Sequence, residues 1–496
     1  MRESGILLPI SSLPSQYGIG CFSKEAYEFV DQLALANQKY WQILPLGPTS
    51  YGDSPYQSFS TYAGNPYFID LNTLIEEGVL TKKECDLADF GSDSRFIDYG
   101  KLYKARYKLL RKAYERSNIS QNPEFRTFQE ENAWWLDDYA LFMAVKGFFQ
   151  DECWDKWPED IKKRYGYALD YYREQLYFEI EFQKYMQFEF SIQWKKLKTY
   201  ANENGIRIIG DIPIYVAYDS ADTWAHPELF QLDEENVPLA VAGCPLDGFA
   251  ADGQLWGNPL YRWDYHRRTG YTWWMQRLSY AFYLYDVVRI DHFRGFDEYF
   301  SIPYGDTTAR NGHWEKGPGI ELFHRMKEVL GERDVIAEDL GYVTDSVRQM
   351  VLESGFPGMK VFEFAFDSRD TGCAGDYLPH NYPVNSVVYT GTHDNATLIG
   401  WYQDIPKESR EMLRDYIHDY TTSDRSLHWS VICRVMGSPA RICMIPMQDY
   451  LGLNNTCRIN TPSTLGTNWK WRLLDGEFTS DLQNKIKKLV RIYQRN

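Results

Sequence analysis

Eight short apolar runs are spread along the chain, each followed by turn-forming residues. They lie at 5–8, 41–46, 206–212, 287–291, 335–338, 359–364, 387–392 and 442–447. Short runs rich in β-branched residues are typical of strands that are buried on both faces. Helical patterns separate many of the runs, as at 24–37, 271–285, 319–330 and 344–354. Alternation of this kind indicates parallel strands joined by right-handed crossovers.

The number of runs predicts an α/β fold, a (β/α)8 TIM barrel, with residues 1–496 forming one domain. An open doubly wound sheet is the competing architecture, but no Gly-x-Gly-x-x-Gly or Gly-x-x-x-x-Gly-Lys turn follows any run. In closed barrels the loops after the strands build the functional site at the carboxyl-terminal face. We therefore expect long loops over that face, with an active-site loop region at 213–262.

The largest gap lies between the second and third runs and predicts a helical insertion subdomain at 66–205. One apolar stripe at helical spacing within it comprises Trp135, Leu136, Tyr139, Phe142 and Met143. A second stripe comprises Phe178, Phe182, Tyr185, Phe188 and Ile192. Stripes of this period mark buried helix faces, so both are expected in the core. A final helix near 481–493 is expected to cover the barrel wall.

The charge of the chain argues against two classes of partner. The formal net charge is −16, whereas nucleic acids and anionic membranes bind basic surfaces. No stretch approaches the roughly 18 consecutive apolar residues of a membrane span, and the first ten residues lack the apolar region of a signal peptide. We expect a neutral substrate and a cytoplasmic location.

Eight cysteines are scattered without a Cys-x-x-Cys pair or His-rich spacing. The pattern suggests neither a zinc site nor a disulfide framework, so we expect reduced thiols and no metal or other cofactor. The sequence leaves the oligomeric state open between monomer and homodimer.

Aromatic residues make up 16% of the chain. Aromatic faces can stack on the apolar faces of sugar rings, so the surplus would suit a surface that handles glycans. For most of these residues, including the two stripes above, a place in the core is the stronger interpretation.

Three acidic motifs give the strongest functional signal. They are Asp-Val-Val-Arg-Ile-Asp-His-Phe-Arg-Gly at 286–295, Val-Ile-Ala-Glu-Asp-Leu-Gly at 335–341 and Val-Val-Tyr-Thr-Gly-Thr-His-Asp-Asn at 387–395. They place Asp291, Glu338 and Asp394 where strands are expected to end. A single acid at such a turn more often caps a helix or pairs with an arginine. Three acids with polar neighbours indicate one catalytic site instead; the neighbours are Arg289, Asp339 and His393.

The spacing of these residues suits acid and base chemistry. Arg289 lies two residues before Asp291, so both side chains point to one face of a strand and the cation can keep the carboxylate ionised. Like charge from Asp291 and Asp394 should raise the pKa of Glu338, as a general acid at neutral pH requires. A structural salt bridge is the alternative role for Arg289, and the two roles are compatible.

Four further segments complete the pattern. They are Gly-Ile-Leu-Leu-Pro-Ile-Ser-Ser-Leu-Pro-Ser-Gln-Tyr-Gly-Ile-Gly at 5–20, Leu-Gly-Pro-Thr-Ser-Tyr-Gly-Asp-Ser-Pro-Tyr-Gln-Ser at 46–58, Gly-Asp-Ile-Pro-Ile-Tyr-Val at 210–216 and Gly-Gln-Leu-Trp-Gly-Asn-Pro at 253–259. With them the chain resembles the amylomaltases or disproportionating enzymes, the 4-alpha-glucanotransferases of glycoside hydrolase family 77 in the alpha-amylase superfamily. The likeness covers nearly the whole chain, and so many ordered matches are specific.

The resemblance implies that Asp291 is the nucleophile, Glu338 the general acid/base and Asp394 the carboxylate that supports the transition state. The residues that it implies for substrate binding are Tyr56, Ser54, Asp211, Trp256, Arg289 and His393. Among these, Tyr56 is expected to stack on the sugar and Trp256 to belong to a loop over the acceptor side of the cleft. A second loop, around 455–465, is expected to close the cleft from the other side.

The implied activity is transfer of an alpha-1,4-glucan segment from a donor maltooligosaccharide to the 4-hydroxyl of glucose or another maltooligosaccharide, by a retaining double displacement. An alpha-glucan hydrolase is the first alternative, because amylases share the three carboxylates. A non-catalytic glycan-binding protein is the second, and it would be expected to lack Asp291 or Glu338.

Overall fold

The computed structural model describes residues 2–50, 52–245, 253–341, 343–366 and 374–496. Its centre is a closed barrel of eight strands in the order β1-β12-β11-β10-β9-β6-β3-β2. The strands are β1 (Glu3–Leu7), β2 (Tyr40–Gln42), β3 (Arg207–Ile212), β6 (Val287–Ile290), β9 (Val335–Ala337), β10 (Gly358–Val361), β11 (Ser386–Tyr389) and β12 (Ile442–Pro446). All neighbouring pairs are parallel. The predicted (β/α)8 barrel is confirmed, and each of the eight apolar runs overlaps one of its strands.

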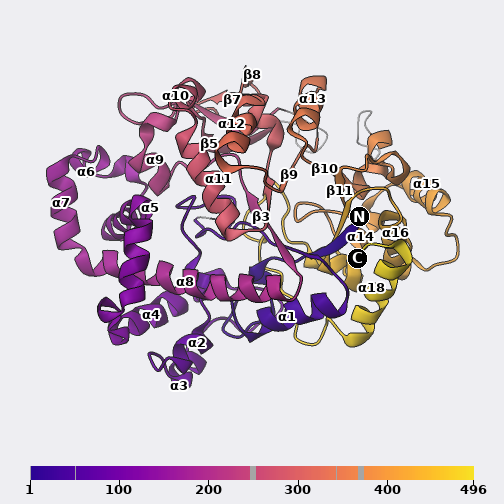
Figure 1. The fold of residues 1–496 in the computed structure, drawn as a ribbon, viewed down its shortest axis with the longest axis horizontal. Helices are drawn as coiled ribbons and strands as arrows, with labels where there is room; N and C mark the ends of the chain where they lie inside the picture. The colour runs from indigo at the N-terminus through magenta and orange to yellow at the C-terminus, as the bar shows by residue number, and fades with distance from the viewer. Residues whose placement is uncertain (1, 51, 246–252, 342, 367–373) are drawn as a thin grey trace.

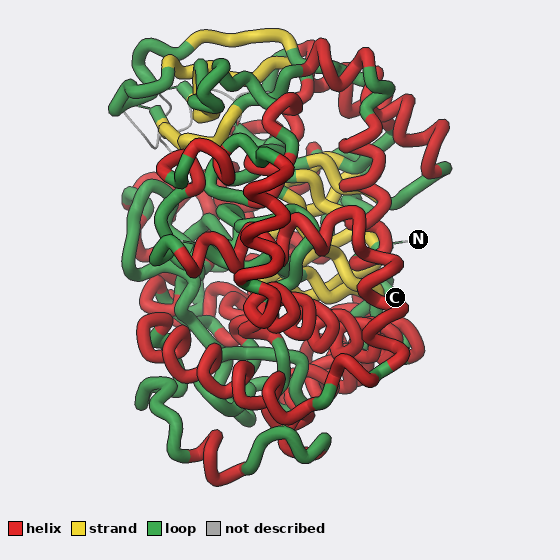
Figure 2. The backbone as a smooth tube through the Cα atoms, turned by 90° about the vertical axis from the view of Figure 1, so that its left-hand side faces the viewer, coloured by secondary structure: helices red, strands yellow, loops and turns green. Residues whose placement is uncertain are grey.

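Helices surround the barrel, as Figures 1 and 2 show from two directions. Those in its outer layer are α1 (Lys24–Leu35), α8 (Tyr177–Glu203), α11 (Thr272–Leu284), α12 (Glu321–Leu330), α13 (Asp345–Ser354), α14 (Leu398–Asp404), α15 (Lys407–Ile417), α16 (Leu427–Met436) and α18 (Ser480–Tyr493). Short helices α9 (Ala221–Ala225), α10 (Trp263–Arg268) and α17 (Met447–Leu451) lie in the connections. None of the helices in the described part of the chain is long and apolar enough to cross a membrane.

The two faces of the barrel strands bury different sets of side chains. Leu7, Ile209 and Val287 belong to an inner cluster with Tyr389 and Met444. The side chains that alternate with them along the strands join the larger cluster between the strands and the helices. A strand buried on both faces has no polar alternation, which is why the runs could be recognised in the sequence.

The segment between β2 and β3 is helical and extends to one side of the barrel (Figure 1). Its helices before α8 are α2 (Leu71–Glu76), α3 (Lys82–Asp86), α4 (Tyr99–Ser117), α5 (Pro123–Phe148), α6 (Glu159–Lys162) and α7 (Gly166–Gln175). The long helix α8 packs on α5 at one side and on α1 and β3 at the other. Helix α8 therefore belongs both to the insertion and to the outer layer of the barrel.

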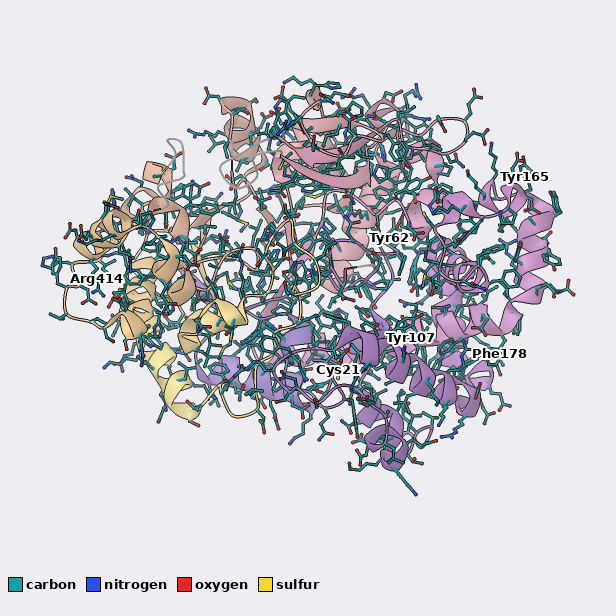
Figure 3. The ribbon with its side chains drawn as sticks, turned by 180° about the vertical axis from the view of Figure 1, so that it is seen from behind. Cys21, Tyr62, Tyr107, Tyr165, Phe178 and Arg414 are labelled. Carbon is teal, nitrogen blue, oxygen red and sulfur yellow. The ribbon has the colours of Figure 1, made fainter. Side chains whose placement is uncertain are left out.

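The expected core stripes are buried with three departures. Met143 of α5 and Ile192 of α8 are only partly buried. In α8, Phe178 is 44% exposed and lies at the outer end of the insertion in Figure 3. Phe178 occupies the first turn of α8, where the guanidinium of Arg111 covers its ring at 5.7 Å from the centroid. A helical period therefore predicted the buried face correctly but not the position at which it begins.

A second, antiparallel sheet with the order β5-β4-β7-β8 stands beside the barrel. Its strands are β4 (Ala240–Cys244), β5 (Gln254–Pro259), β7 (Glu298–Pro303) and β8 (His313–Lys316). The sequence analysis did not predict this sheet. It has a small apolar core that includes Phe300 and Ile302, and the register of β4 against β5 shifts between Val241 and Gly243. The region 213–262 thus contains regular structure as well as loops.

The backbone of β3 is packed directly against an aromatic ring. A Cβ atom placed on Gly210 would lie 2.1 Å from Cγ of Tyr285, whose side chain is buried. We predict that Gly210→Ala lowers the free energy of unfolding by about 1–3 kcal/mol, the usual cost of overpacking a core. Urea denaturation followed by circular dichroism measures the shift.

The matched control is Gly147→Ala in α5, because a Cβ there has nothing within 4 Å and alanine favours a helix. This control should leave the denaturation midpoint unchanged or raise it. A Gly210→Ala protein with the midpoint of the unsubstituted protein would contradict the packing described here.

Candidate active site

Six of the nine predicted site residues lie at or near the carboxyl ends of four barrel strands. Asp211 lies near the end of β3 and pairs in register with Arg289 of β6. Asp291 and Glu338 directly follow β6 and β9, and the segment with Asp394 follows β11. Because the strands are parallel, these ends share one face of the barrel. The structure therefore brings together residues that are up to 183 positions apart in the chain, from Asp211 to Asp394.

Arg289 is the centre of the arrangement. Its side chain is 4% exposed, and Nη1 lies 2.7 Å from Oδ2 of Asp211 while Nη2 lies 3.0 Å from Oδ1 of Asp291. The same Oδ2 atom of Asp211 accepts a hydrogen bond of 2.7 Å from the hydroxyl of Tyr56. A buried guanidinium needs such partners, because an unpaired charge away from water is costly.

Burial and the charge of Arg289 act on the pKa of Asp291 in opposite directions. Burial raises the pKa of its carboxyl group above the ordinary range, while the positive charge of Arg289 opposes the rise. The nearby carboxylates of Asp211 and Asp394 raise the pKa further. The sequence analysis expected Arg289 to keep Asp291 ionised. Arg289 does favour the ionised form, but it offsets only part of the effect of burial.

Among the described residues, no guanidinium group bonds Glu338, although the charge of Arg289 opposes part of the rise of its pKa. Its Oε2 accepts a hydrogen bond of 2.7 Å from the backbone N–H of His292, and its Oε1 accepts one of 2.9 Å from that of Leu340. Burial raises the pKa of Glu338, and the negative charge of Asp291 raises it further. The expected raised pKa is supported, but burial is a larger cause than like charge.

The residue after Asp291 makes this contact possible. His292 has a φ of 49°, in the left-handed region that a residue with a side chain rarely adopts. This turn directs the N–H of His292 at Glu338, and thereby joins the ends of β6 and β9. Burial lowers the pKa of His292 to about 3, so its ring is neutral near pH 7.

Asp394 differs from the other two carboxylates. Burial would raise its pKa, but the charge and hydrogen bond of His393 and a hydrogen bond from Asn460 hold it well below the ordinary range. Nε2 of His393 lies 3.3 Å from Oδ2 of Asp394, and Nδ2 of Asn460 donates to Oδ1 at 2.6 Å. The site thus contains two carboxyl groups with raised pKa values and one that stays ionised.

Three rings form one wall beside these acids. The ring of Tyr56 stacks on His393, with centroids 5.1 Å apart and an interplanar angle of 14°. Trp469 lies at 5.9 Å from Tyr56 and 6.0 Å from His393. Ser54 accepts a hydrogen bond of 3.2 Å from the backbone N–H of Tyr56. Ser54 therefore supports the turn that carries Tyr56, and no contact joins it to the three carboxylates.

The segment around 455–465 supplies residues that the sequence analysis did not single out. Besides its bond to Asp394, Asn460 donates its backbone N–H to the carbonyl of His393 at 3.1 Å, and Arg458 donates to the carbonyl of Asp394. Both residues lie in the loop after β12, and no motif in the sequence marks them. Their position in the loop that was expected to close the cleft is the one available signal.

Hydrogen bonds to a buried carboxylate stabilise the loop that contains His393 and Asp394. Asp449 accepts hydrogen bonds from the hydroxyl of Thr390 and from the backbone N–H of Leu398, at 2.5 and 2.7 Å. These two residues flank the loop on either side. Burial raises the pKa of Asp449 to about 6. The neighbour of Glu338, Asp339, has a comparable structural role, since it accepts the backbone N–H of Met359 at 2.7 Å.

Trp256 is connected to the site by a ring contact with His292, the residue after Asp291. Its ring meets the imidazole edge to face, with centroids 4.9 Å apart. The residue was expected in a loop, but it belongs to strand β5 of the antiparallel sheet. The preceding part of the expected loop, 246–252, lies outside the described residues.

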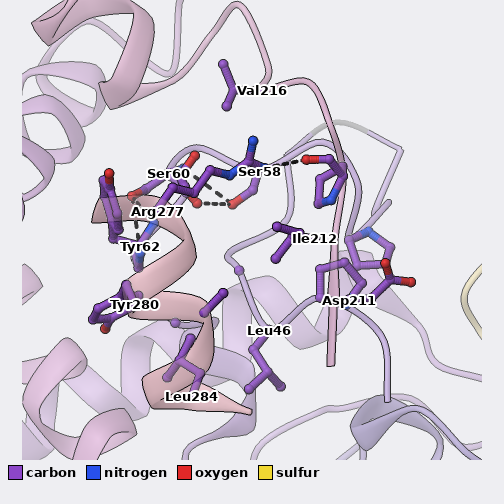
Figure 4. A pocket seen from close by; sticks show the side chains of 18 of the residues that line it. Leu46, Ser58, Ser60, Tyr62, Asp211, Ile212, Val216, Arg277, Tyr280 and Leu284 are labelled. Carbon is purple, nitrogen blue, oxygen red and sulfur yellow. Dashed lines mark hydrogen bonds between the residues drawn. The ribbon is translucent and has the colours of Figure 1, made fainter. Parts of the chain in front are cut away.

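A pocket extends from this wall, and Figure 4 shows its side chains. It has a cavity volume of about 60 Å³, and both Tyr56 and Asp211 line it. Its far side is formed by Tyr62, Arg277 and Tyr280. Within the described residues, no group of three or more His, Cys, Asp or Glu side chains is arranged to hold a metal ion.

Comparisons with known proteins show the family of the chain. A family model described as 4-alpha-glucanotransferase matches residues 8–477. The 4-alpha-glucanotransferase of Clostridium butyricum is 49% identical over 488 residues, which are 98% of this chain and 99% of that protein. That of Thermus thermophilus is 45% identical over 503 residues, covering 100% of this chain and 99% of that protein.

Solved structures show the same architecture. The amylomaltase from Streptococcus agalactiae in complex with acarbose has a TM-score of 0.96 and 40% identity, and the match covers 100% of both chains. The amylomaltase from Corynebacterium glutamicum shares the fold with a TM-score of 0.74 at 19% identity, covering 100% of this chain and 75% of that one.

The contact between His393 and Asp394 can be tested without a substrate. The carboxylate raises the pKa of His393, whereas burial lowers it. We predict that Asp394→Asn lowers the pKa of His393, because the main effect that opposes burial is lost with the negative charge. Titration of histidine-labelled protein by NMR measures the change, and His393→Gln identifies the resonance. An unchanged titration of His393 in Asp394→Asn would contradict the ion pair.

Proposed function

The chain belongs to the 4-alpha-glucanotransferase family, and from this premise we propose that Asp291, Glu338 and Asp394 carry out its reaction. The enzyme is a glycosyltransferase that acts on alpha-1,4-glucans. The observation that carries the assignment is the unequal environment of the acids. Arg289 pairs with Asp291, the backbone N–H groups of His292 and Leu340 donate to Glu338, and His393 pairs with Asp394.

In the first step, the carboxylate of Asp291 attacks the anomeric carbon of a donor glucosyl residue. The bond from that carbon to the glycosidic oxygen breaks, and Glu338 delivers its proton to the departing oxygen. A carboxyl group of raised pKa still holds this proton near neutral pH. The products are a glucosyl ester on Asp291 and a shortened glucan that leaves with its new 4-hydroxyl.

In the second step, Glu338 is ionised and acts as the base. It removes the proton from the 4-hydroxyl of an acceptor, whose oxygen attacks the anomeric carbon and displaces Asp291. Two inversions at one carbon restore the alpha configuration. The hydrogen bonds from His292 and Leu340 hold the carboxyl group of Glu338 in one orientation for both proton transfers.

Asp394 and its neighbours bind the sugar that is distorted between these steps. A carboxylate that stays ionised can accept hydrogen bonds from ring hydroxyls, and such bonds strengthen as positive charge develops at the anomeric carbon. The side chain of Asp394 is 45% exposed, so it faces the open part of the site. The stacked ring of Tyr56 and the buried carboxylate of Asp211 are placed to hold the same sugar.

The choice of acceptor depends on excluding water. Asn460 of the loop after β12 and Trp256 of β5 border the acids through the contacts described above. These neighbours and the aromatic wall favour an oriented sugar over water. The comparisons favour transfer over the amylase-type hydrolysis that the three acids alone would also permit.

The relatives also bear on the ligand. One of the solved relatives holds acarbose, which supports maltooligosaccharides as ligands of this chain as well. The cytoplasmic location and the state of the chain, monomer or homodimer, stay predictions. The expectation of reduced thiols stays a prediction as well.

Product analysis tests the proposal directly. Incubation of the pure enzyme with maltotriose should give glucose together with a ladder of longer maltooligosaccharides, measured by anion-exchange chromatography. Asp291→Asn should abolish the ladder, with a loss of at least about 10³-fold in rate, because the nucleophile is removed. Maltose and glucose without a ladder would instead make the enzyme a hydrolase, and an active Asp291→Asn would refute the assigned nucleophile.

The paired acids predict a bell-shaped pH dependence of kcat/KM. Burial and the charge of Asp291 raise the pKa of Glu338 to about 7, and activity should fall as the pH rises through this value because the acid loses its proton. Burial raises the pKa of Asp291 to about 6 against the effect of Arg289. Activity should therefore fall again as the pH drops through that value, because the nucleophile becomes protonated.

Initial rates with maltotriose across about pH 4–10 measure the two limbs, which belong to the pair of carboxyl groups jointly. Activity that still increases above about pH 8 would contradict Glu338 as the acid of the first step.

A further inference from the structure

A groove lies between two helices of the outer layer, α8 and α11, with α5 at one end. Its cavity volume is about 240 Å³, and it is separate from the three catalytic carboxylates. We call it the α8–α11 groove. Facing sides of neighbouring barrel helices normally pack with apolar side chains and leave no such space. The residues that line this groove are instead of two contrasting kinds.

The α8 side carries a stripe of hydrogen-bonding groups. Ser191, Lys195 and Thr199 are spaced four residues apart and therefore lie along one face of the helix. Within the described part of the chain, none of these three side chains has a hydrogen bond or ion pair. Their neighbour Lys198 differs, because its ammonium group donates to the carbonyl of Tyr283 at 3.0 Å and lies 3.6 Å from Asp286.

The α11 side presents aromatic rings. Tyr280 and Tyr283 have ring centroids 5.9 Å apart, and Tyr283 is 55% exposed. Trp135 of α5, which is buried, also lines the groove, and its ring centroid lies 5.9 Å from that of Tyr280. Trp194 closes the bottom of the groove. The exposed ring of Tyr283 and the half-buried ring of Tyr280 thus lie across the groove from hydroxyl and ammonium groups that have no partner among the described residues.

This combination matches one class of ligand. A sugar ring has apolar C–H faces that stack on aromatic rings and equatorial hydroxyls that hydrogen-bond at its edge. An anionic ligand fits less well, because Asp286 already neutralises Lys198 and leaves Lys195 as the single free cation among the described lining residues. The volume lies below the roughly 300–1,000 Å³ of sites that enclose a whole small ligand, which suits a short stretch of a longer chain.

We propose that the α8–α11 groove is a second binding site for alpha-1,4-glucan, distinct from the active site. The groove is adjacent to the pocket of Figure 4, because Phe190, Tyr280 and Leu284 line both. A long glucan held there would raise the local concentration of chain ends near the site without new contacts to the carboxylates. The benefit should increase with chain length and be small for maltotriose.

Calorimetric titration of full-length Asp291→Asn with maltoheptaose tests the site, because this variant cannot consume the ligand. Two binding sites are expected, and the further substitution Tyr283→Ala should leave one. Lys195→Met, which keeps the length of the side chain but removes its donors, should weaken the second site about three- to tenfold. Thermal unfolding checks that each variant is folded. The matched control is Tyr171→Ala on α7, whose ring is similarly exposed at 56% but lies outside the groove.

A kinetic measurement tests the proposed site independently of the binding experiment. With Asp291 intact, Tyr283→Ala should raise the KM for amylose about three- to tenfold relative to the KM for maltotriose, since a stacked ring contributes about this much to affinity. A single site in Asp291→Asn would overturn the proposal. Two sites that persist in both groove variants, or that are lost in Tyr171→Ala instead, would overturn it as well.

Discussion

The guanidinium group of Arg289 is buried in the mouth of the barrel, and the arrangement of the acids around it follows from that position. A cation with 4% of its side chain exposed requires anionic partners, and the register of β3 against β6 places Asp211 beside it. The alternation of a strand then brings Asp291, two residues later, to the same side. The opposing pull of burial and Arg289 gives Asp291 a different environment from Glu338. Two acids of one chemical type can therefore take different roles in one site.

The sequence predicted some parts of the fold and not others. Strands buried on both faces give apolar runs, so all eight barrel strands were predicted. The four strands of the antiparallel sheet were not predicted. His-Trp-Glu-Lys in β8 has no apolar alternation, and β5 contains Gly257 and Pro259. Such strands are held by pairing with β4 and β7, which a local pattern does not reveal.

Some residues of the site could likewise be predicted from the sequence, and others could not. The carboxylates Asp291, Glu338 and Asp394 could be predicted because acids at strand ends share one face of a barrel. The groups that orient them could not, because they act through contacts between distant loops. Asn460 and Asp449 fix the loop of Asp394 from the segment after β12, and His292 reaches Glu338 only because its backbone adopts a left-handed turn. Neither kind of contact can be recognised from the order of residues in the sequence.

The central claim is that Asp291 becomes covalently bonded to the sugar while Glu338 moves the proton. Mass spectrometry of Glu338→Gln after reaction with an alpha-maltosyl fluoride tests it most directly, because fluoride leaves without a proton while deglycosylation still needs the missing base. The account predicts a maltosyl adduct on the peptide that contains Asp291, and none in the Asp291→Asn protein treated in the same way. An adduct on Asp394, or no adduct despite consumption of the fluoride, would contradict it.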